Sequence, residues 1–282
     1  MATIGFIAHH ERSEAATIAR EAIGRLIGEG HQVRTLAGEG GPALSEWAVD
    51  AGNLAQGLDL AVSVGGDGTM LRTVDLVCGA GVPVLGVNVG HLGYLSAVEP
   101  DGLDGALRRF LDGQYEIEER MTLQVAVTRS GTTTTHAALN EAVVEKTVSG
   151  HTVRLGVQVN GEPFTTYAAD GVIVATPTGS TAYNLSARGP IVSPRHRALL
   201  VTPVSPHMLF DRTLVLDQSE TVDLTVIDGR QAALVLDGRD TGVLEAGDVV
   251  SCSAGPVDAR LVSFGRRDFH RILKAKFGLA DR

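Results

Sequence analysis

Apolar positions near the start of the chain alternate between continuous runs and helix-spaced patterns. The segments that we expect to be strands are Ile4–Ala8, Gln32–Leu36, Leu58–Val64 and Val82–Val87, of which Ile4–Ala8 and Leu58–Val64 are the apolar runs typical of buried strands. Helical spacing follows the first run, in a segment that we expect Ser13 to cap and Gly28–Gly30 to end. It recurs from about Met70 to Cys78 and over Leu103–Leu111. Strands that alternate with helices in this way predict a parallel sheet covered by helices.

The pattern changes from about Tyr115 to short strand-like runs separated by turns. The pairs Asn160–Gly161 and Asp228–Gly229 are hairpin signals, because both residue types tolerate positive φ. Thr132–Thr135 is expected to be an exposed turn. The runs are Leu123–Thr128, Ala142–Glu145, Val153–Asn160, Gly171–Ala175, Ala198–Pro203, Thr213–Leu216, Thr221–Ile227, Ala233–Leu236 and Val249–Ser253. This part of the chain therefore predicts a β-rich sandwich or layered sheets.

These patterns predict a fold class of α/β plus all-β. A doubly wound α/β domain occupies residues 1–112, and a β-rich layered domain occupies residues 113–262. Helical spacing returns over Asp268–Phe277. We expect this tail, residues 263–282, to pack on the first domain.

Composition narrows the partners. The 282 residues carry a net charge of −9, which argues against nucleic acid or an anionic membrane as the main partner. The negative charge does not exclude phosphate ligands, because backbone N–H groups and metal ions can bind phosphate inside an acidic protein. Cys78 and Cys252 lie far apart in apolar stretches, as expected of reduced thiols. Without an export signal or an apolar stretch of roughly 18 residues, we expect a cytoplasmic protein.

The strongest local motif is Gly65-Gly66-Asp67-Gly68-Thr69, which follows a predicted strand and precedes a predicted helix. Glycines allow the backbone to turn sharply and approach a ligand, and the N-terminus of the helix offers free N–H groups to phosphate. An aspartate would repel bare phosphate. It fits a group that takes a proton from a hydroxyl nucleophile or binds a metal held by the phosphates. The alternative is a tight turn with a capping aspartate.

Three further segments combine polar residues with turns. Asn88–Leu95 is a glycine-containing loop after a predicted strand. The pair Asn140–Glu141 offers donor and acceptor atoms suited to an adenine edge and to ribose hydroxyls. In Asp170–Ser186, a strand runs into a turn rich in Thr, Ser, Gly and Pro that opens a helix. Hydroxyl and N–H groups that converge in this way bind a nucleotide without Lys or Arg.

Taken together, these segments resemble a known family. Gly65–Thr69 resembles the motif shared by NAD kinases, diacylglycerol and sphingosine kinases and, with variation, phosphofructokinases. Asp170–Ser186 is close to residue-for-residue identical to the NAD kinase signature, which those relatives lack. The resemblance continues to the Asp237-Gly238 turn, and it is weakest before about residue 55. The chain is therefore identified as a member of the NAD kinase family.

The resemblance implies transfer of the γ-phosphate of ATP, or of polyphosphate, to the 2′-hydroxyl of the adenosine ribose of NAD. Asp67 would be the catalytic base, with Mg²⁺ bound to ATP and with NAD as substrate. The protein would be a homodimer or homotetramer that binds neither nucleic acid nor membrane. The implied nucleotide-binding residues are Gly65, Gly66, Gly68, Thr69, Arg72, Asn140, Glu141, Asp170, Thr178, Thr181, Ala182, Tyr183, Asn184, Leu185, Ser186 and Arg239.

The chain departs from the family pattern in three places. Ala168 stands where the family often has a basic residue, and Arg188 stands where it usually has glycine. Arg239 replaces a frequent glutamine and is either a phosphate contact or a solvated turn residue. Arg72 is likewise a phosphate contact or a surface residue.

Two other functions stay open at this point. One is a lipid or sugar kinase of the same superfamily. The other is an inactive NAD(P)-binding sensor, for which the loss of the basic residue at Ala168 is the one argument.

Overall fold

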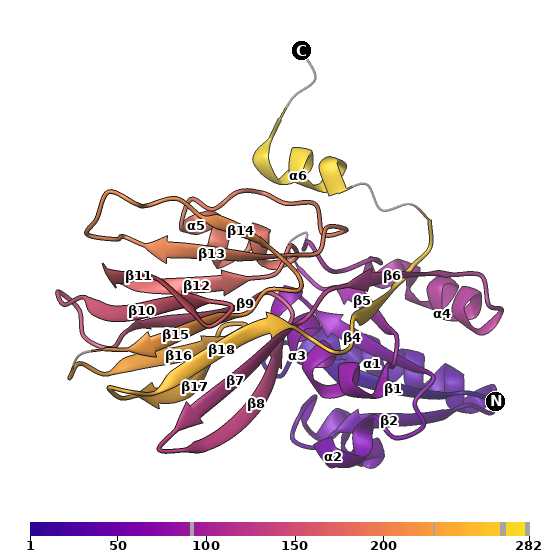
Figure 1. Cartoon of the computed structure of the whole chain (residues 1–282). Helices are drawn as coiled ribbons and strands as arrows, with labels where there is room; N and C mark the ends of the chain where they lie inside the picture. The colour runs from indigo at the N-terminus through magenta and orange to yellow at the C-terminus, as the bar shows by residue number, and fades with distance from the viewer. Residues whose placement is uncertain (91–92, 228, 266–268, 280–282) are drawn as a thin grey trace. The chain divides into compact units, whose positions relative to one another are not determined.

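The computed structural model describes residues 1–90, 93–227, 229–265 and 269–279. The chain divides into two compact units, Met1–Glu119 with Ala259–Arg282, and Arg120–Asp258 (Figure 1). We call these unit 1 and unit 2. Unit 1 is therefore built from two separate stretches of sequence, and unit 2 is inserted between them.

Unit 1 contains a seven-stranded sheet in the order β3-β2-β1-β4-β5-β19-β6. The neighbours from β3 to β5 pair in parallel, as does β5 with β19. Because β1 lies between β2 and β4, the carboxyl ends of these three strands meet at one edge of the sheet. The strands are β1 (Thr3–Ala8), β2 (Gln32–Leu36), β3 (Ala48–Val49), β4 (Leu60–Gly65), β5 (Val84–Asn88), β6 (Glu116–Arg120) and β19 (Ala259–Ser263).

Helices cover both faces of this sheet. Helices α1 and α4 share an apolar cluster with Ile4, Phe6 and Val62. On the opposite face, a side chain at Gly5 would meet Leu54 of α2, and one at Gly86 would meet Met70 of α3. The α-helices are α1 (Ser13–Gly28), α2 (Ala51–Leu54), α3 (Asp67–Val77), α4 (Leu103–Leu111) and α6 (Phe269–Phe277), with 3-10 turns at Gly41–Ala43, Ser45–Trp47, Cys78–Ala80 and Pro100–Gly102. The predicted doubly wound arrangement is confirmed.

Unit 2 consists of two six-stranded antiparallel sheets, in the orders β11-β10-β15-β18-β7-β8 and β14-β13-β12-β9-β16-β17. Its helical turns are η5 (Gly179–Thr181) and α5 (Tyr183–Ser186). The strands are β7 (Leu123–Arg129), β8 (Thr132–Ala138), β9 (Glu141–Lys146), β10 (Val153–Val159), β11 (Glu162–Ala169), β12 (Gly171–Ala175), β13 (Ala198–Val204), β14 (Leu214–Asp217), β15 (Val222–Val226), β16 (Ala232–Leu236), β17 (Arg239–Leu244) and β18 (Val249–Ala254).

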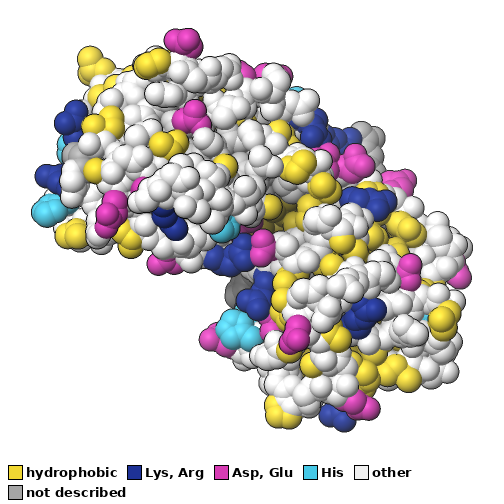
Figure 2. Space-filling model, turned by 60° about the horizontal axis from the view of Figure 1, so that its bottom comes forward, with side chains coloured by type: hydrophobic (Ala, Val, Ile, Leu, Met, Phe, Trp, Pro, Cys, Tyr) yellow, Lys and Arg dark blue, Asp and Glu magenta, His cyan; other side chains and the backbone are white. Residues whose placement is uncertain are grey.

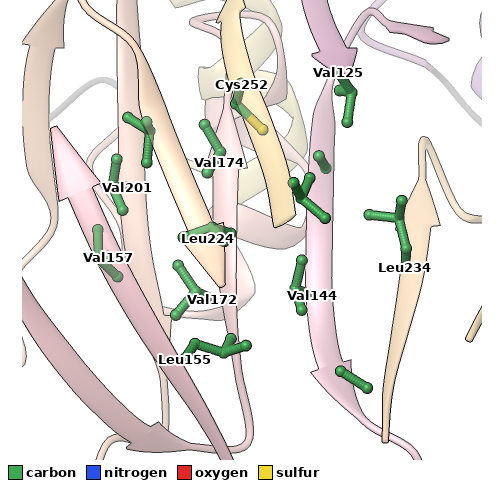
Figure 3. Close-up of a cluster of buried hydrophobic side chains, with 14 of the residues drawn as sticks. Val125, Val144, Leu155, Val157, Val172, Val174, Val201, Leu224, Leu234 and Cys252 are labelled. Carbon is green, nitrogen blue, oxygen red and sulfur yellow. The ribbon is translucent and has the colours of Figure 1, made fainter. Parts of the chain in front are cut away.

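Side chains from both sheets of unit 2 form one apolar core. Leu155 and Leu224 come from the first sheet, and Val144, Val172 and Leu234 come from the second (Figure 3). Alternate residues of β12 pack instead into a second cluster on the outer side of their sheet. Strand β12 is therefore buried on both faces, which explains its unbroken apolar sequence.

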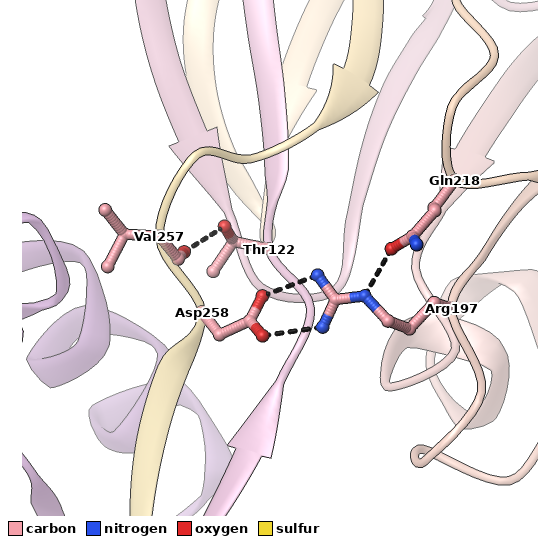
Figure 4. Close-up of polar contacts among 5 residues, drawn as sticks. All are labelled: Thr122, Arg197, Gln218, Val257 and Asp258. Carbon is pink, nitrogen blue, oxygen red and sulfur yellow. Dashed lines mark hydrogen bonds and ion pairs between the residues drawn. The ribbon is translucent and has the colours of Figure 1, made fainter.

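Polar contacts fasten the end of unit 2, where the chain returns to unit 1 (Figure 4). Two nitrogens of Arg197 donate to the carboxylate of Asp258 at 2.6 and 3.0 Å, and the side chain of Gln218 accepts a further bond from Arg197. The hydroxyl of Thr122 donates to the carbonyl of Val257 at 2.7 Å. These bonds join the segments just before β7 and just after β18 to the residues that flank the β13–β14 hairpin.

Several predictions of local structure were wrong. Thr132–Thr135 belongs to strand β8 at a sheet edge, because four exposed β-branched residues suit an edge strand as well as a turn. Helix α3 begins at Asp67 instead of Met70. Ser13 is the first residue of α1, whose cap position is Arg12 without a side-chain bond. Strands β3, β6, β11, β17 and β19 were not predicted.

One predicted turn and the predicted thiols agree with the structure. The Asn160–Gly161 turn is confirmed, with φ values of 54° and 79°. Asp228 of the second predicted turn lies outside the described residues. Both cysteines are free and buried. Across the described part of the chain, none of the helices has the length and hydropathy needed to cross a bilayer.

Candidate active site

The phosphate loop lies where β4 passes into α3. Strand β4 ends at Gly65, Gly66 takes an extended conformation at the cap position, and α3 begins at Asp67. Within the described residues, no side chain caps this terminus by a hydrogen bond. The backbone N–H groups of the first helical turn are therefore available to an anion, as the motif predicts.

The carboxylate of Asp67 is held by a second loop of unit 1. Its oxygens accept hydrogen bonds from the backbone N–H of Tyr94 at 2.9 Å and of Leu95 at 3.1 Å. A side chain on Gly93 would place its Cβ 2.2 Å from Oδ1 of Asp67, so only glycine allows this approach. The structure thus brings together two segments that the sequence analysis singled out separately. His91 and Leu92 of the second segment lie outside the described residues.

The tail helix α6 reaches the same loop. Nζ of Lys276 lies 4.2 Å from the ring centre of Tyr94. A cation over an aromatic face is attracted by the ring quadrupole. Burial, and then the charge of Asp67, raise the pKa of the Tyr94 hydroxyl.

Arg72 of α3 forms an ion pair with Glu39, which follows β2. Burial of Glu39 raises the pKa of its carboxyl, and the nearby charges of Arg72 and His10 oppose that rise. His10 stacks on His9, with 5.1 Å between the ring centres. Arg72 is thus half-exposed and is held by Glu39 through its Nε atom. Glu39, which follows β2, and His10, which follows β1, are close enough for their charges to interact.

In unit 2, Asp237 positions the Asn140–Glu141 pair. Its carboxylate accepts the backbone N–H groups of Leu139, Asn140 and Glu141 at 2.7, 2.8 and 3.1 Å. Three such bonds fix the start of β9 against the β16–β17 turn. Asp237 was not predicted as a site residue, although an aspartate at a turn is a signal for this kind of bonding.

Glu141 is a buried carboxyl with an elevated pKa. Its side chain is enclosed, and its pKa is raised to about 8, first by burial and then by the charge of Asp237. A hydrogen bond from the backbone N–H of Tyr183 opposes this rise. Among the described residues, its Oε2 has no hydrogen-bond partner. The raised pKa favours the protonated carboxyl, whose O–H could donate one hydrogen bond to a ligand.

The turn after β12 packs directly on the Asn140–Glu141 pair. The backbone N–H of Thr176 donates to the carbonyl of Asn140 at 2.8 Å, and its hydroxyl donates to the carbonyl of Leu139 at 2.6 Å. A Cβ at Gly179 would lie 2.2 Å from the same Asn140 carbonyl oxygen. Two more of the predicted site segments are therefore adjacent.

Residues 178–186 divide into a buried set and an exposed set. Thr178 is buried and accepts a bond from Arg120. Asn184 is fully enclosed, and its side chain bonds the hydroxyl of Thr202 and the carbonyl of Pro190, which gives it a structural role. The residues that remain accessible to a ligand are Thr181, Ala182, Tyr183, Leu185 and Ser186.

Acidic groups surround Tyr183. Burial raises the pKa of its hydroxyl, and the charges of Glu145, Asp170 and Glu141 add to the effect. Nζ of Lys146 lies 2.5 Å from Oδ1 of Asp170. Lys146 thus places a positive charge beside Asp170, although Ala168 lacks one.

The two unusual arginines occupy different settings. Arg239 begins β17 directly after Asp237-Gly238, and its charge lowers the pKa of Asp237 against the larger effect of burial. Arg188 adopts a φ of 65°, a conformation that favours glycine. The backbone conformation therefore explains why glycine suits position 188. Arg239 lies beside Asp237, the residue that holds the Asn140–Glu141 pair.

Charge and metal ligands are dispersed. On the face shown in Figure 2, acidic and basic side chains are interspersed with neutral and apolar ones. Within the described ranges, no three His, Cys, Asp or Glu residues are grouped closely enough to hold a metal ion.

Comparisons with known proteins agree with this arrangement. Residues 4–115 match the ATP-NAD kinase N-terminal domain, and residues 139–264 match the ATP-NAD kinase C-terminal domain. The chain is 36% identical over 287 residues to the NAD kinase of Syntrophotalea carbinolica, with all of both chains covered. It is 48% identical over 221 residues to that of Heliobacterium modesticaldum, with 78% of each covered.

Two solved structures share the fold. A yeast NADH kinase complexed with NADH superposes with a TM-score of 0.92 at 23% identity, covering 100% of this chain and 89% of that one. An NAD kinase from Archaeoglobus fulgidus in complex with ATP gives 0.74 at 22% identity, with 99% of each covered. From the domain matches and the full-length relatives, the chain belongs to the NAD kinase family.

Proposed function

We propose that this protein transfers the γ-phosphoryl group of ATP to the 2′-hydroxyl of the adenosine ribose of NAD, which yields NADP. Its family membership supports the reaction. The observation that carries the proposal is the setting of Asp67, a carboxylate fixed by two backbone N–H groups at an uncapped helix N-terminus. A base and a phosphate site are thereby adjacent.

Asp67 acts as the general base or orienting acceptor for the 2′-hydroxyl. A carboxylate has about four acceptor positions, and the bonds from Tyr94 and Leu95 use two of them. The remaining lone pairs can accept the proton of the attacking hydroxyl. The bonds from the loop prevent rotation of the carboxylate, which favours a fixed line of attack.

The donor phosphates bind at the N–H groups of the first turn of α3, beside Gly65, Gly66, Gly68 and Thr69. Phosphoryl transfer relies chiefly on positioning and on stabilising charge. Mg²⁺ bound with ATP would neutralise charge on the phosphates, and Asp67 is the carboxylate of this loop that could bind it. This fits a cation that takes one carboxylate and several phosphate or water ligands.

NAD binds in unit 2. The carboxyl of Glu141 donates to a nucleotide acceptor atom, and Asp170 accepts from ribose hydroxyls while Lys146 compensates its charge. Accessible groups of Thr181, Tyr183 and Ser186 complete the site. Arg239 is the residue from which we expect a contact with phosphate.

We further propose a homodimer or homotetramer that functions in the cytoplasm. Two free, buried cysteines are typical of a reducing compartment. Light scattering after size exclusion would give the subunit number.

The proposal is tested by measuring NADP formation from NAD with Mg-ATP, or with Mg-polyphosphate, for the wild type and for Asp67→Asn. We expect the substitution to lower kcat by about a hundredfold or more, which is the size of a lost general base. The exposed Asp112→Asn on the same unit serves as control and should retain wild-type activity. A wild type that binds NAD and forms no NADP from either donor would indicate a sensor instead of a kinase.

A further inference from the structure

The two side chains of the Glu39–Arg72 ion pair differ greatly in solvent exposure, and the proposed reaction does not explain this difference. The side chain of Glu39 is 8% exposed, whereas that of Arg72 is 52% exposed. The bond runs from Nε of Arg72 to Oε1 of Glu39. In the described part of the chain, Oε2 of Glu39 has no partner. A buried carboxyl therefore holds the inner edge of a guanidinium group that remains accessible to solvent.

The helix directs this guanidinium toward the phosphate loop. Gly68 and Arg72 are four residues apart on α3 and so lie on one face of the helix. Helical side chains lean toward the N-terminus, which carries Arg72 over the turn that contains Gly68. Among the described residues, and apart from the two chain neighbours of Gly68 and the backbone of its own helix, no atom lies within 4 Å of the position that a Cβ of Gly68 would take. A ligand group can therefore approach α3 at Gly68.

The sheet places Glu39 at the matching edge. Glu39 follows β2, and the phosphate loop follows β4; both strands flank β1. In open parallel sheets, ligands bind outside the carboxyl ends of the strands, where the strand order reverses. In this sheet that place is between β1 and β4.

We propose that Glu39 is a positioning residue that holds Arg72 over the first turn of α3, so that its guanidinium binds the phosphates of the donor nucleotide. This inference rests on the proposed function and specifies its donor site. Arginine binds phosphate through a planar fork whose direction decides whether two bonds form. Fixing Nε against a buried carboxyl sets that direction before the nucleotide arrives.

A carboxylate beside the site also has an opposing effect, since its charge repels phosphate. The two effects predict opposite changes in ATP affinity when the charge of Glu39 is removed. If orientation dominates, Glu39→Gln weakens the binding of ATP. If repulsion dominates, or if Glu39 holds Arg72 away from the donor, Glu39→Gln tightens it.

The test measures the Kd of Mg-ATP by calorimetry, together with KM for Mg-ATP and for NAD. For Glu39→Gln we expect the Kd and the KM of Mg-ATP to rise roughly tenfold, the size of one charged hydrogen bond, with the KM of NAD unchanged. Arg72→Ala should raise them at least as much, and the double variant should be no weaker than Arg72→Ala alone. Unchanged or tighter ATP binding by Glu39→Gln would overturn the inference.

Two controls separate this result from misfolding. Asp104→Asn removes the exposed ion pair with Arg25 on the same unit and should leave both KM values unchanged. Arg72→Lys keeps the charge at a half-exposed position without the fork, so it should weaken ATP binding even if Glu39→Gln fails to fold. A wild type that makes no NADP would refute the proposed function, while the calorimetry would still decide the role of Glu39.

Discussion

At the scale of single residues, Arg188 has a strained backbone conformation. Its φ of 65° is a left-handed conformation that glycine adopts without strain. We expect Arg188→Gly to raise the free energy of unfolding by about 0.5–1 kcal/mol, because the relief of strain exceeds the added entropy of the unfolded chain. Urea denaturation measures the change. Arg195→Gly, at an exposed position outside that conformation, should bring no gain.

Glu141 makes stability depend on pH. Its pKa is raised from 4.5 to about 8, so the folded state favours the protonated carboxyl. The stability that this group contributes is fully present below about pH 4.5 and is lost as the pH rises toward 8. Between pH 5 and 8.5, the Tm of the wild type should therefore fall more than that of Glu141→Gln. Glu162→Gln, at an exposed position, should follow the wild type; parallel curves for all three proteins would refute the argument.

At the scale of elements, the approach of η5 to β9 depends on the absence of one side chain. A Cβ at Gly179 would lie 2.2 and 2.6 Å from the carbonyl oxygen and carbon of Asn140. Gly179→Ala must therefore separate the two segments. We expect a loss of about 1–3 kcal/mol in the free energy of unfolding and a higher KM for NAD. Gly24→Ala, which has open space in helix α1, is the matched control and should be neutral or stabilising.

Prediction from the sequence succeeded where burial gives an element an unbroken apolar run. Strands β4 and β12 are buried throughout and were found from such runs. Strand β11 begins with three exposed residues of mixed type, Glu162–Phe164, and β8 is a run of exposed threonines at an edge. Their positions depend on pairing with β10 and β7, and no local pattern records that pairing.

The candidate site was found as separate segments and not as an arrangement. The glycine-rich turn before α3 was recognisable because its residue types follow from the local backbone. The contacts of Asp67 with Tyr94 and of Asp237 with Asn140 join residues 27 and 97 positions apart. Bonds from backbone N–H groups place little constraint on the residue that donates them, so these contacts leave a weak signal in one sequence.

At the scale of the whole molecule, the two family domains correspond to different kinds of architecture within one chain. Residues 4–115 fall in the α/β unit, and residues 139–264 cover most of the all-β unit and continue into β19. The second match thus includes the strand with which the chain returns to unit 1. The sheet of unit 1 is therefore made of strands from both parts of the chain, the first six from residues before unit 2 and β19 from residues after it.

That return has a consequence for biosynthesis. Strand β19 lies between β5 and β6 in the finished sheet, yet a ribosome makes it only after all of unit 2. While the nascent chain grows, β5 and β6 have no central neighbour and present open edges, which are prone to mispairing. The inserted unit, a continuous stretch, can fold first, and the amino-terminal sheet closes last. Unit 1, whose first strands are made before unit 2, is thus completed after it.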